Sequence, residues 1–211
     1  MVIPSDTELT ESGLSATGRG RILVLACGAL AREILALIAL NGWDHVDLQC
    51  LPAKLHNTPD QIPQAVRRAV AERQPDYDRI FVAYADCGTG GLLEAACAEI
   101  GVAMIAGPHC YAFFDGLAAF AERDEMDAFF LTDFLARQFD TLVWKGLKLD
   151  RHPQLLPMIF GHYTRVVYLA QTEDPGLTRL AEAAADKLGL RFERRFTGYG
   201  DLAQALEAQA V

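Results

Sequence analysis

The chain has 211 residues, of which 51% are hydrophobic and 22% charged, a composition that suits a folded protein with a substantial core. Its net charge of −9 argues against nucleic acid or an anionic membrane surface as a partner. No apolar run approaches the ~20 residues that a membrane-spanning helix needs.

Residues 1–20 are polar and contain no apolar segment of the kind found in signal peptides, so we expect a flexible lead-in. The five cysteines are an odd number in a chain without an export signal, which favours free thiols in a reducing compartment. The sequence therefore predicts a cytoplasmic protein with one folded domain over residues 21–211.

Strand-like and helical segments alternate from residue 21 onward. The expected strands are residues 21–26, 46–52, 79–85, 102–107, 165–171 and 191–198. The expected helices between and after them are residues 29–40, 62–73, 91–101, 177–189 and 201–209. Residues 111–162 are aromatic-rich and mostly helical, and we interpret them as an insertion over one edge or mouth of the sheet. This pattern predicts a doubly wound α/β fold, with a mostly parallel sheet of about six strands and helices on both faces.

Three cysteines stand where an expected strand gives way to a loop: Cys27, Cys87 and Cys110. The carboxyl ends of parallel strands share one edge of the sheet, so these thiols are expected to converge there. We predict a metal site formed by the three cysteines and His109, with His56 as an alternative ligand. Mixed cysteine and histidine ligands favour zinc over an iron–sulfur cluster.

The segment DCGTGG, residues 86–91, opens a helix with few side chains and leaves backbone N–H groups free to bind an anionic group. The same helix end favours the thiolate form of Cys87, so we assign catalytic roles to Cys87, His109 and Asp86. The residues expected to bind a cofactor or ligand are Gly88, Thr89, Gly90, Gly91 and Tyr111.

Two other functions remain open from the residues alone. The first is a metal-free cysteine enzyme for a small anionic substrate, with Cys87 as nucleophile and His109 as its partner. The second is a non-catalytic subunit that binds a small molecule and whose cysteines are merely buried. Cys50 and Cys97 are interpreted as core residues in every case.

The segments ACGALAREI, NGWDHVDLQCLPAKLHN, YDRIFVAYADCGTGG, GPHCYAFF, FFLTDFLARQFD and TGYGDL resemble an uncharacterised bacterial and archaeal family, the 1638 series of domains of unknown function. The resemblance spans residues 21–206. Members of that family are often associated with corrinoid-dependent methyltransferase systems. The resemblance therefore implies an enzyme or accessory factor in methyl-group metabolism that contacts a corrinoid, a corrinoid protein or a methyltransferase. It assigns no catalytic residues.

Overall fold

The computed structural model describes residues 4–210, which divide into two compact units. Within the described residues, the first unit comprises 4–110 with 201–210, and the second comprises 111–200. The single folded domain predicted for residues 21–211 stays a prediction. Among the described residues, no helix combines the length and the apolar character needed to cross a membrane.

The first unit is built on a parallel sheet with the strand order β2-β1-β3-β4. Its strands are β1 (Ile22–Cys27), β2 (Val46–Leu51), β3 (Arg79–Ala83) and β4 (Ala103–Met104). Ile22 pairs with Val46 on one side and with Arg79 on the other, which makes β1 a central strand. All six residues of β1 are buried, because helices cover both faces of the sheet.

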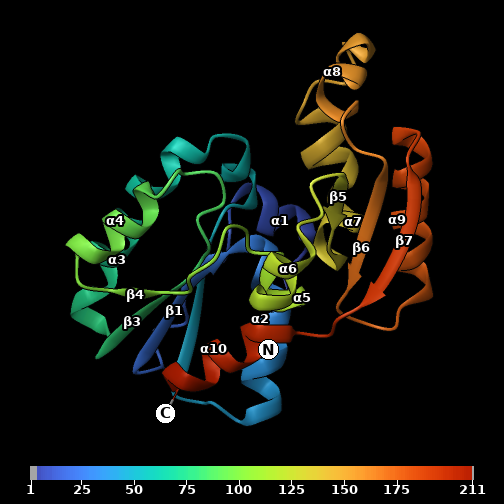
Figure 1. Ribbon diagram of the computed structural model, residues 1–211. Helices are drawn as coiled ribbons and strands as arrows, with labels where there is room; N and C mark the ends of the chain where they lie inside the picture. The colour runs from blue at the N-terminus through green and yellow to red at the C-terminus, as the bar shows by residue number, and fades with distance from the viewer. Residues whose placement is uncertain (1–3, 211) are drawn as a thin grey trace. The chain divides into compact units, whose positions relative to one another are not determined.

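The helices of this unit lie on the two faces of the sheet (Figure 1). Helices α3 (Ile62–Arg73) and α4 (Leu92–Glu99) lie together on one face, and α2 (Ala31–Asn41) and α10 (Gly200–Ala210) lie on the other. Helix α2 ends at Gly42, whose left-handed φ of 62° lets its N–H reach back to the last turn.

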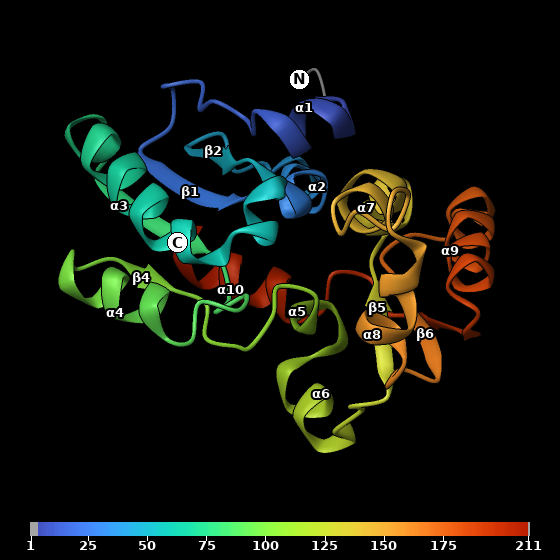
Figure 2. The same ribbon diagram turned by 90° about the horizontal axis from the view of Figure 1, so that it is seen from above.

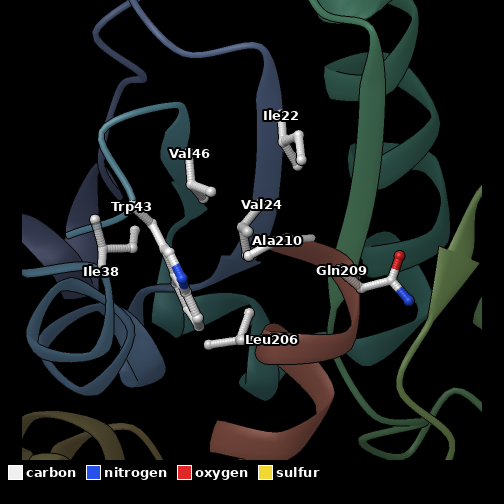
Figure 3. A pocket seen from close by; sticks show the side chains of 8 residues that line it. All are labelled: Ile22, Val24, Ile38, Trp43, Val46, Leu206, Gln209 and Ala210. Carbon is white, nitrogen blue, oxygen red and sulfur yellow. The ribbon is translucent and has the colours of Figure 1, made fainter. Parts of the chain in front are cut away.

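Helix α10 returns from the end of the described chain to cover β1 and β2. The apolar seam between this helix and the sheet is shown in Figure 3 and is lined by Ile22, Val24, Ile38, Trp43, Val46, Leu206, Gln209 and Ala210. It has no room for a water molecule, so it is a packing seam rather than a binding site. Two polar contacts fasten the helix: His45 Nε2 lies 2.7 Å from the Ala210 carbonyl, and Arg79 donates to the Gln209 carbonyl at 3.0 Å.

Part of the predicted flexible lead-in is ordered. Helix α1 (Asp6–Glu11) begins with a capping box in which Ser5 and Glu8 each bond the other's backbone N–H. Leu9 of this helix is fully buried, and Leu14 forms an antiparallel bridge to Cys50 at the edge of β2. These residues thus contribute a helix and a buried side chain to the first unit, and the flexibility expected of residues 1–20 stays a prediction.

The second unit contains a parallel sheet with the order β5-β6-β7. Its strands are β5 (Ala128–Leu131), β6 (Arg165–Ala170) and β7 (Arg191–Phe196), and its helices are α5 (Ala112–Asp115), α6 (Leu117–Arg123), α7 (Asp133–Gln138), α8 (Leu156–Phe160) and α9 (Pro175–Leu188). Helices α7 and α9 share one core on one face of the sheet (Figure 2). Tyr111 and Phe120 pack on the other face.

The described strands thus form an α/β structure with two parallel sheets, in place of the one sheet of about six strands predicted. The predicted insertion, residues 111–162, is mostly helical but also contains β5. The sequence of β5, AFFL, is short, buried and aromatic, and its flanks read as helix, so sequence periodicity alone does not separate it from a buried helix.

Candidate metal centre

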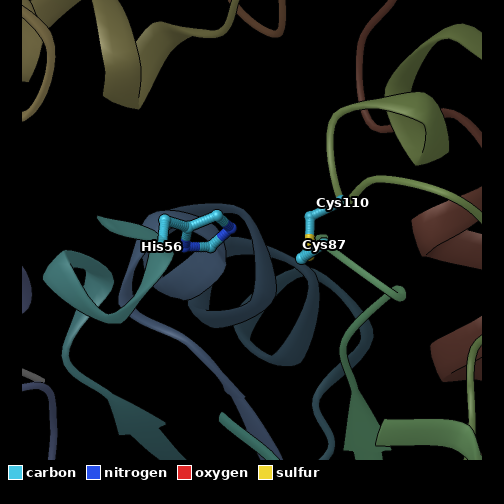
Figure 4. Close-up of side chains that lie close together, drawn as sticks. All are labelled: His56, Cys87 and Cys110. Atoms are coloured by element: carbon cyan, nitrogen blue, oxygen red, sulfur yellow. The ribbon is translucent and has the colours of Figure 1, made fainter. Parts of the chain in front are cut away.

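The carboxyl edge of the first sheet brings together three side chains from three different loops (Figure 4). His56 lies in the 3-10 turn Ala53–Asn57 after β2, Cys87 in the turn after β3, and Cys110 in the loop after β4. One ligand atom from each residue lies within 4.8 Å of the other two, and the sulfurs of Cys87 and Cys110 are 3.1 Å apart. We refer to these residues as the His56–Cys87–Cys110 cluster, and it could hold a metal ion.

Backbone hydrogen bonds fix the two cysteine loops against each other. The N–H of Asp86 donates to the Gly107 carbonyl and that of Cys87 donates to the Pro108 carbonyl, both at 2.9 Å. These bonds extend the pairing of β3 and β4 beyond the two-residue strand β4. They place Cys87 beside Cys110 by main-chain contacts, which do not depend on side-chain rotamers.

Cys87 has an unusual backbone conformation. Its φ is +49°, a left-handed value that costs a residue with a Cβ atom of the order of 1 kcal/mol and that glycine adopts freely. Gly88, Gly90 and Gly91 in the same turn also have positive φ, so the turn is left-handed almost throughout. A cysteine at this position retains a strained backbone in order to present its side chain, and strain of this kind concentrates at functional sites.

The turn formed by residues 86–91 binds the side-chain carboxylate of its own first residue, Asp86. Asp86 accepts hydrogen bonds from the Thr89 hydroxyl at 2.6 Å and from the N–H groups of Gly91 and Gly90 at 2.6 and 3.0 Å. Although burial raises the pKa of Asp86, these bonds outweigh it and hold that pKa below its usual value. The N–H groups predicted to bind an external anion at Gly90 and Gly91 are therefore already engaged, and the catalytic role assigned to Asp86 stays a prediction.

His56 is held through its second ring nitrogen. Nδ1 lies 3.2 Å from the Ala53 carbonyl and 3.6 Å from the Cys27 sulfur, while Figure 4 shows the ring directed toward Cys87 and Cys110. Metal-bound histidines usually donate their other N–H to such a backbone partner. Dense packing around the ring would by itself lower the pKa of His56, but the sulfurs of Cys27 and Cys87 raise it well above its usual value. His56 is nevertheless exposed to solvent, whereas Cys87 and Cys110 are buried.

The two clustered thiols differ in acidity. A hydrogen bond from Cys110, aided by His56, holds the pKa of Cys87 well below its usual value, although burial opposes this shift. The same bond, together with burial, raises the pKa of Cys110 well above its usual value. The Cys110 sulfur also accepts the Ala85 N–H at 3.5 Å. These opposite shifts make Cys87 the more acidic of the two thiols.

Two of the four predicted metal ligands lie beside the cluster rather than in it. Cys27, at the end of β1, is fully buried, and its sulfur accepts the Ala29 N–H at 3.4 Å and contacts His56, but it falls outside the 4.8 Å group. His109 also falls outside that group, and burial lowers its pKa. Of the two histidines considered, His56 lies in the group and His109 does not, and the identity of the histidine ligand stays a prediction.

Three further residues that could have belonged to the site occupy other environments. Tyr111, predicted to bind a ligand, stacks on Phe130 with ring centroids 5.2 Å apart in the core of the second unit, and its binding role stays a prediction. Cys97 is buried in α4, where burial raises its pKa to about 11. Sequence reasoning did not single out Tyr84, a fully buried residue whose pKa is raised by burial and by the neighbouring Cys27 thiol.

An open groove adjoins the turn that carries His56. It has a volume of about 540 Å³ and lies between the edge of β2 and helix α3. Its lining combines apolar side chains such as Leu51 and Leu55 with polar ones such as Gln64 and Arg68. Such a mixed surface could accept a small molecule next to the cluster.

Comparisons with known proteins identify the family. No curated protein and no solved structure matches the chain. The sequence model of a family described as "Protein of unknown function (DUF1638)" matches residues 50–206, a span that includes all three members of the cluster and leaves Cys27 outside. That description names no activity, so the association with corrinoid metabolism stays a prediction. Because the match covers well over half of the chain, the protein belongs to the DUF1638 family.

Proposed function

We propose that the protein binds one transition-metal ion, with zinc favoured, through His56, Cys87 and Cys110. The observation that carries the proposal is the approach of their ligand atoms to within 4.8 Å of one another. Sulfurs bound to one tetrahedral zinc at ~2.3 Å lie about 3.8 Å apart, so the Cys87 and Cys110 side chains need only small rotations to admit the ion. Zinc accepts this mixture of nitrogen and sulfur ligands readily.

Three protein ligands leave the fourth position of a tetrahedral ion for water or a small ligand, as in catalytic rather than purely structural zinc sites. His56 is exposed to solvent and a groove adjoins the turn that carries it, and both observations support access for a small molecule. A metal-activated water or thiol there would serve an enzyme or an accessory factor. The predicted corrinoid or methyltransferase partner rests on the family resemblance, and the predicted cytoplasmic location rests on the composition. The proposal of metal binding depends on neither of them.

A metal-free cysteine enzyme is the second candidate, and the left-handed backbone of Cys87 favours it. A nucleophile held on a strained turn beside a histidine is a recurring arrangement for covalent catalysis. In this structure the partner in the cluster is His56 rather than the predicted His109. Alkylation of Cys87 that is fast in the metal-free protein and unaffected by added zinc would favour this candidate over the first.

The test is elemental analysis of protein purified without oxygen, using single substitutions in the cluster and a matched control. Wild type is expected to carry close to one equivalent of metal, and Cys87→Ser, Cys110→Ser and His56→Gln to lose most of it. Cys97→Ser removes a buried thiol from the helix that follows Cys87 and should retain the metal.

The proposal fails if wild type holds less than ~0.2 equivalents and takes up neither zinc nor iron, because a working site binds far more tightly than that. It also fails if Cys87→Ser and Cys97→Ser retain the same amount of metal.

A further inference from the structure

The sulfurs of Cys87 and Cys110 are placed for a reaction with each other as well as for metal binding. They lie 3.1 Å apart as free thiols, about 1 Å more than the length of a disulfide bond. The loops that carry them are joined by the main-chain bonds of Asp86 and Cys87 described above, so the two thiols stay close in the folded protein. We propose that Cys87 and Cys110 form a dithiol that a small peroxide oxidises to a disulfide, releasing the metal.

The environments of the two sulfurs give them different roles. Cys87 follows a strand end and precedes the exposed Gly88, and it lies beside the exposed His56 ring. Cys110 is held from the interior by the N–H of Ala85, a fully buried residue. Cys87 is therefore the thiol that meets the oxidant, and Cys110 is the thiol that resolves the product.

The oxidant is expected to be small because both thiols are nearly covered. Cys87 has 8% and Cys110 has 6% of its surface exposed, which is too little for a protein disulfide to align with either sulfur and favours a small oxidant such as hydrogen peroxide. In the first step the O–O bond of hydrogen peroxide breaks, the Cys87 sulfur gains an S–OH group and one water leaves. In the second step the Cys110 sulfur displaces that oxygen as a second water and the S–S bond forms.

Disulfide formation would dismantle the metal site. The two sulfurs give up two electrons to the peroxide and cease to be thiolates, which are the form that binds metal. His56 alone does not hold the ion, so two of its three protein ligands are lost in one event. This consequence rests on the proposed metal site, whereas the dithiol reaction rests only on the two sulfurs.

The experiment begins with full-length, reduced protein that is stripped of metal and treated with one equivalent of hydrogen peroxide. Peptide mapping should find a Cys87–Cys110 disulfide and a mass loss of two hydrogen atoms. In Cys110→Ser, dimedone should label a sulfenic acid on Cys87, whereas Cys87→Ser should give no label on Cys110. The Cys97→Ser control should form the same disulfide as wild type. A disulfide between Cys27 and Cys87, or no disulfide in wild type, would overturn the proposal.

A second arm uses zinc-loaded protein and a chromogenic chelator. One ion should be released per disulfide formed and should rebind after reduction. If the disulfide forms but the reduced protein does not bind zinc, the proposed metal site is rejected and the proposed dithiol reaction is retained. Zinc that remains bound after the disulfide has formed would reject the release mechanism itself.

Discussion

Cys87 combines a backbone that favours glycine with a side chain that contacts two neighbours. Its φ of +49° is a value that glycine adopts without strain. Its sulfur nevertheless contacts Cys110 and belongs to the His56–Cys87–Cys110 cluster. Cys97, by contrast, lies in the last turn of α4, where a helical backbone holds a buried thiol. The two cysteines belong to the same strand–helix unit, and the difference in their backbones can be measured.

Glycine and alanine substitutions should have opposite orders of stability at these two positions. Cys87→Gly is expected to have a higher free energy of unfolding than Cys87→Ala by ~1 kcal/mol, because glycine removes the left-handed strain. Cys97→Gly is expected to be less stable than Cys97→Ala by a similar ~1 kcal/mol, because glycine disfavours a helix interior. Urea unfolding of the four metal-free variants measures both differences. The same order at both positions would show that the Cys87 backbone is not strained.

The sequence predicts the composition of the site better than its geometry. Convergence of Cys27, Cys87 and Cys110 follows from the rule that parallel strands end at one edge, and the thiols of Cys87 and Cys110 do meet there. The choice between His56 and His109 depends on side-chain directions within two loops, which no local pattern encodes. The capture of the Gly90 and Gly91 N–H groups by Asp86 could have been anticipated, since aspartate before a glycine turn commonly bonds the following backbone.

Strand β2 carries a side chain, that of Asp47, which forms hydrogen bonds with two other segments of the chain. Asp47, on this strand, accepts hydrogen bonds from the Thr17 hydroxyl, from the Arg19 N–H at 2.9 Å and from the Tyr77 hydroxyl at 2.8 Å. Burial would raise the pKa of Asp47, but these bonds outweigh it and hold the pKa below the ordinary value of 3.8. A depressed pKa in the folded state means that the ionised form stabilises the fold.

The stability that Asp47 provides should therefore disappear in acid. It is fully present above the pKa of the unfolded chain, near 3.8, and is lost as the pH falls through the lower pKa of the folded state. Asp47→Asn should be less stable than wild type at neutral pH, and the difference should shrink below about pH 4. Urea unfolding at a series of pH values measures it. A difference that stays constant down to about pH 3 would contradict this assignment.

Strand prediction succeeded where a strand is long and failed where it is short. The expected strands at residues 165–171 and 191–198 correspond to β6 and β7, whose ends differ from the prediction by at most two residues. The strand expected at residues 102–107 is reduced to β4, only two residues long, and β5 was read as helix. The division into two sheets also escaped prediction, because the pairing of β5 with β6 is a non-local property.

At the scale of the whole molecule, the first unit is assembled from two separate stretches of chain. Its sheet comes from residues before 111, whereas α10, which covers β1 and β2, comes from residues after 199. Leu206 of this helix is 2% exposed and lines the seam against the sheet. The late helix is thus part of the core of the first unit.

Truncation of Leu206 tests this contribution. Leu206→Ala should lower the free energy of unfolding by ~2–4 kcal/mol, because a buried leucine leaves a cavity when it is shortened. The control is Leu180→Ala on α9, where the side chain is 49% exposed and the loss should stay within about 0.5 kcal/mol. Urea denaturation of both variants gives the comparison. Equal losses would indicate that α10 rests on the sheet without stabilising it.

The position of α10 near the C-terminal end of the described residues has a consequence for folding during translation. All three members of the cluster are synthesised by residue 110, but the helix that shields Ile22 and Val24 begins at residue 200. At a translation rate of about 5–20 residues per second, the ribosome needs roughly 5–20 s to make the intervening stretch. During that interval the three residues of the cluster can already gather, while the face of the sheet that α10 shields is covered by α2 alone. A nascent chain in this state would be a substrate for chaperones, and metal capture could precede the completion of its own domain.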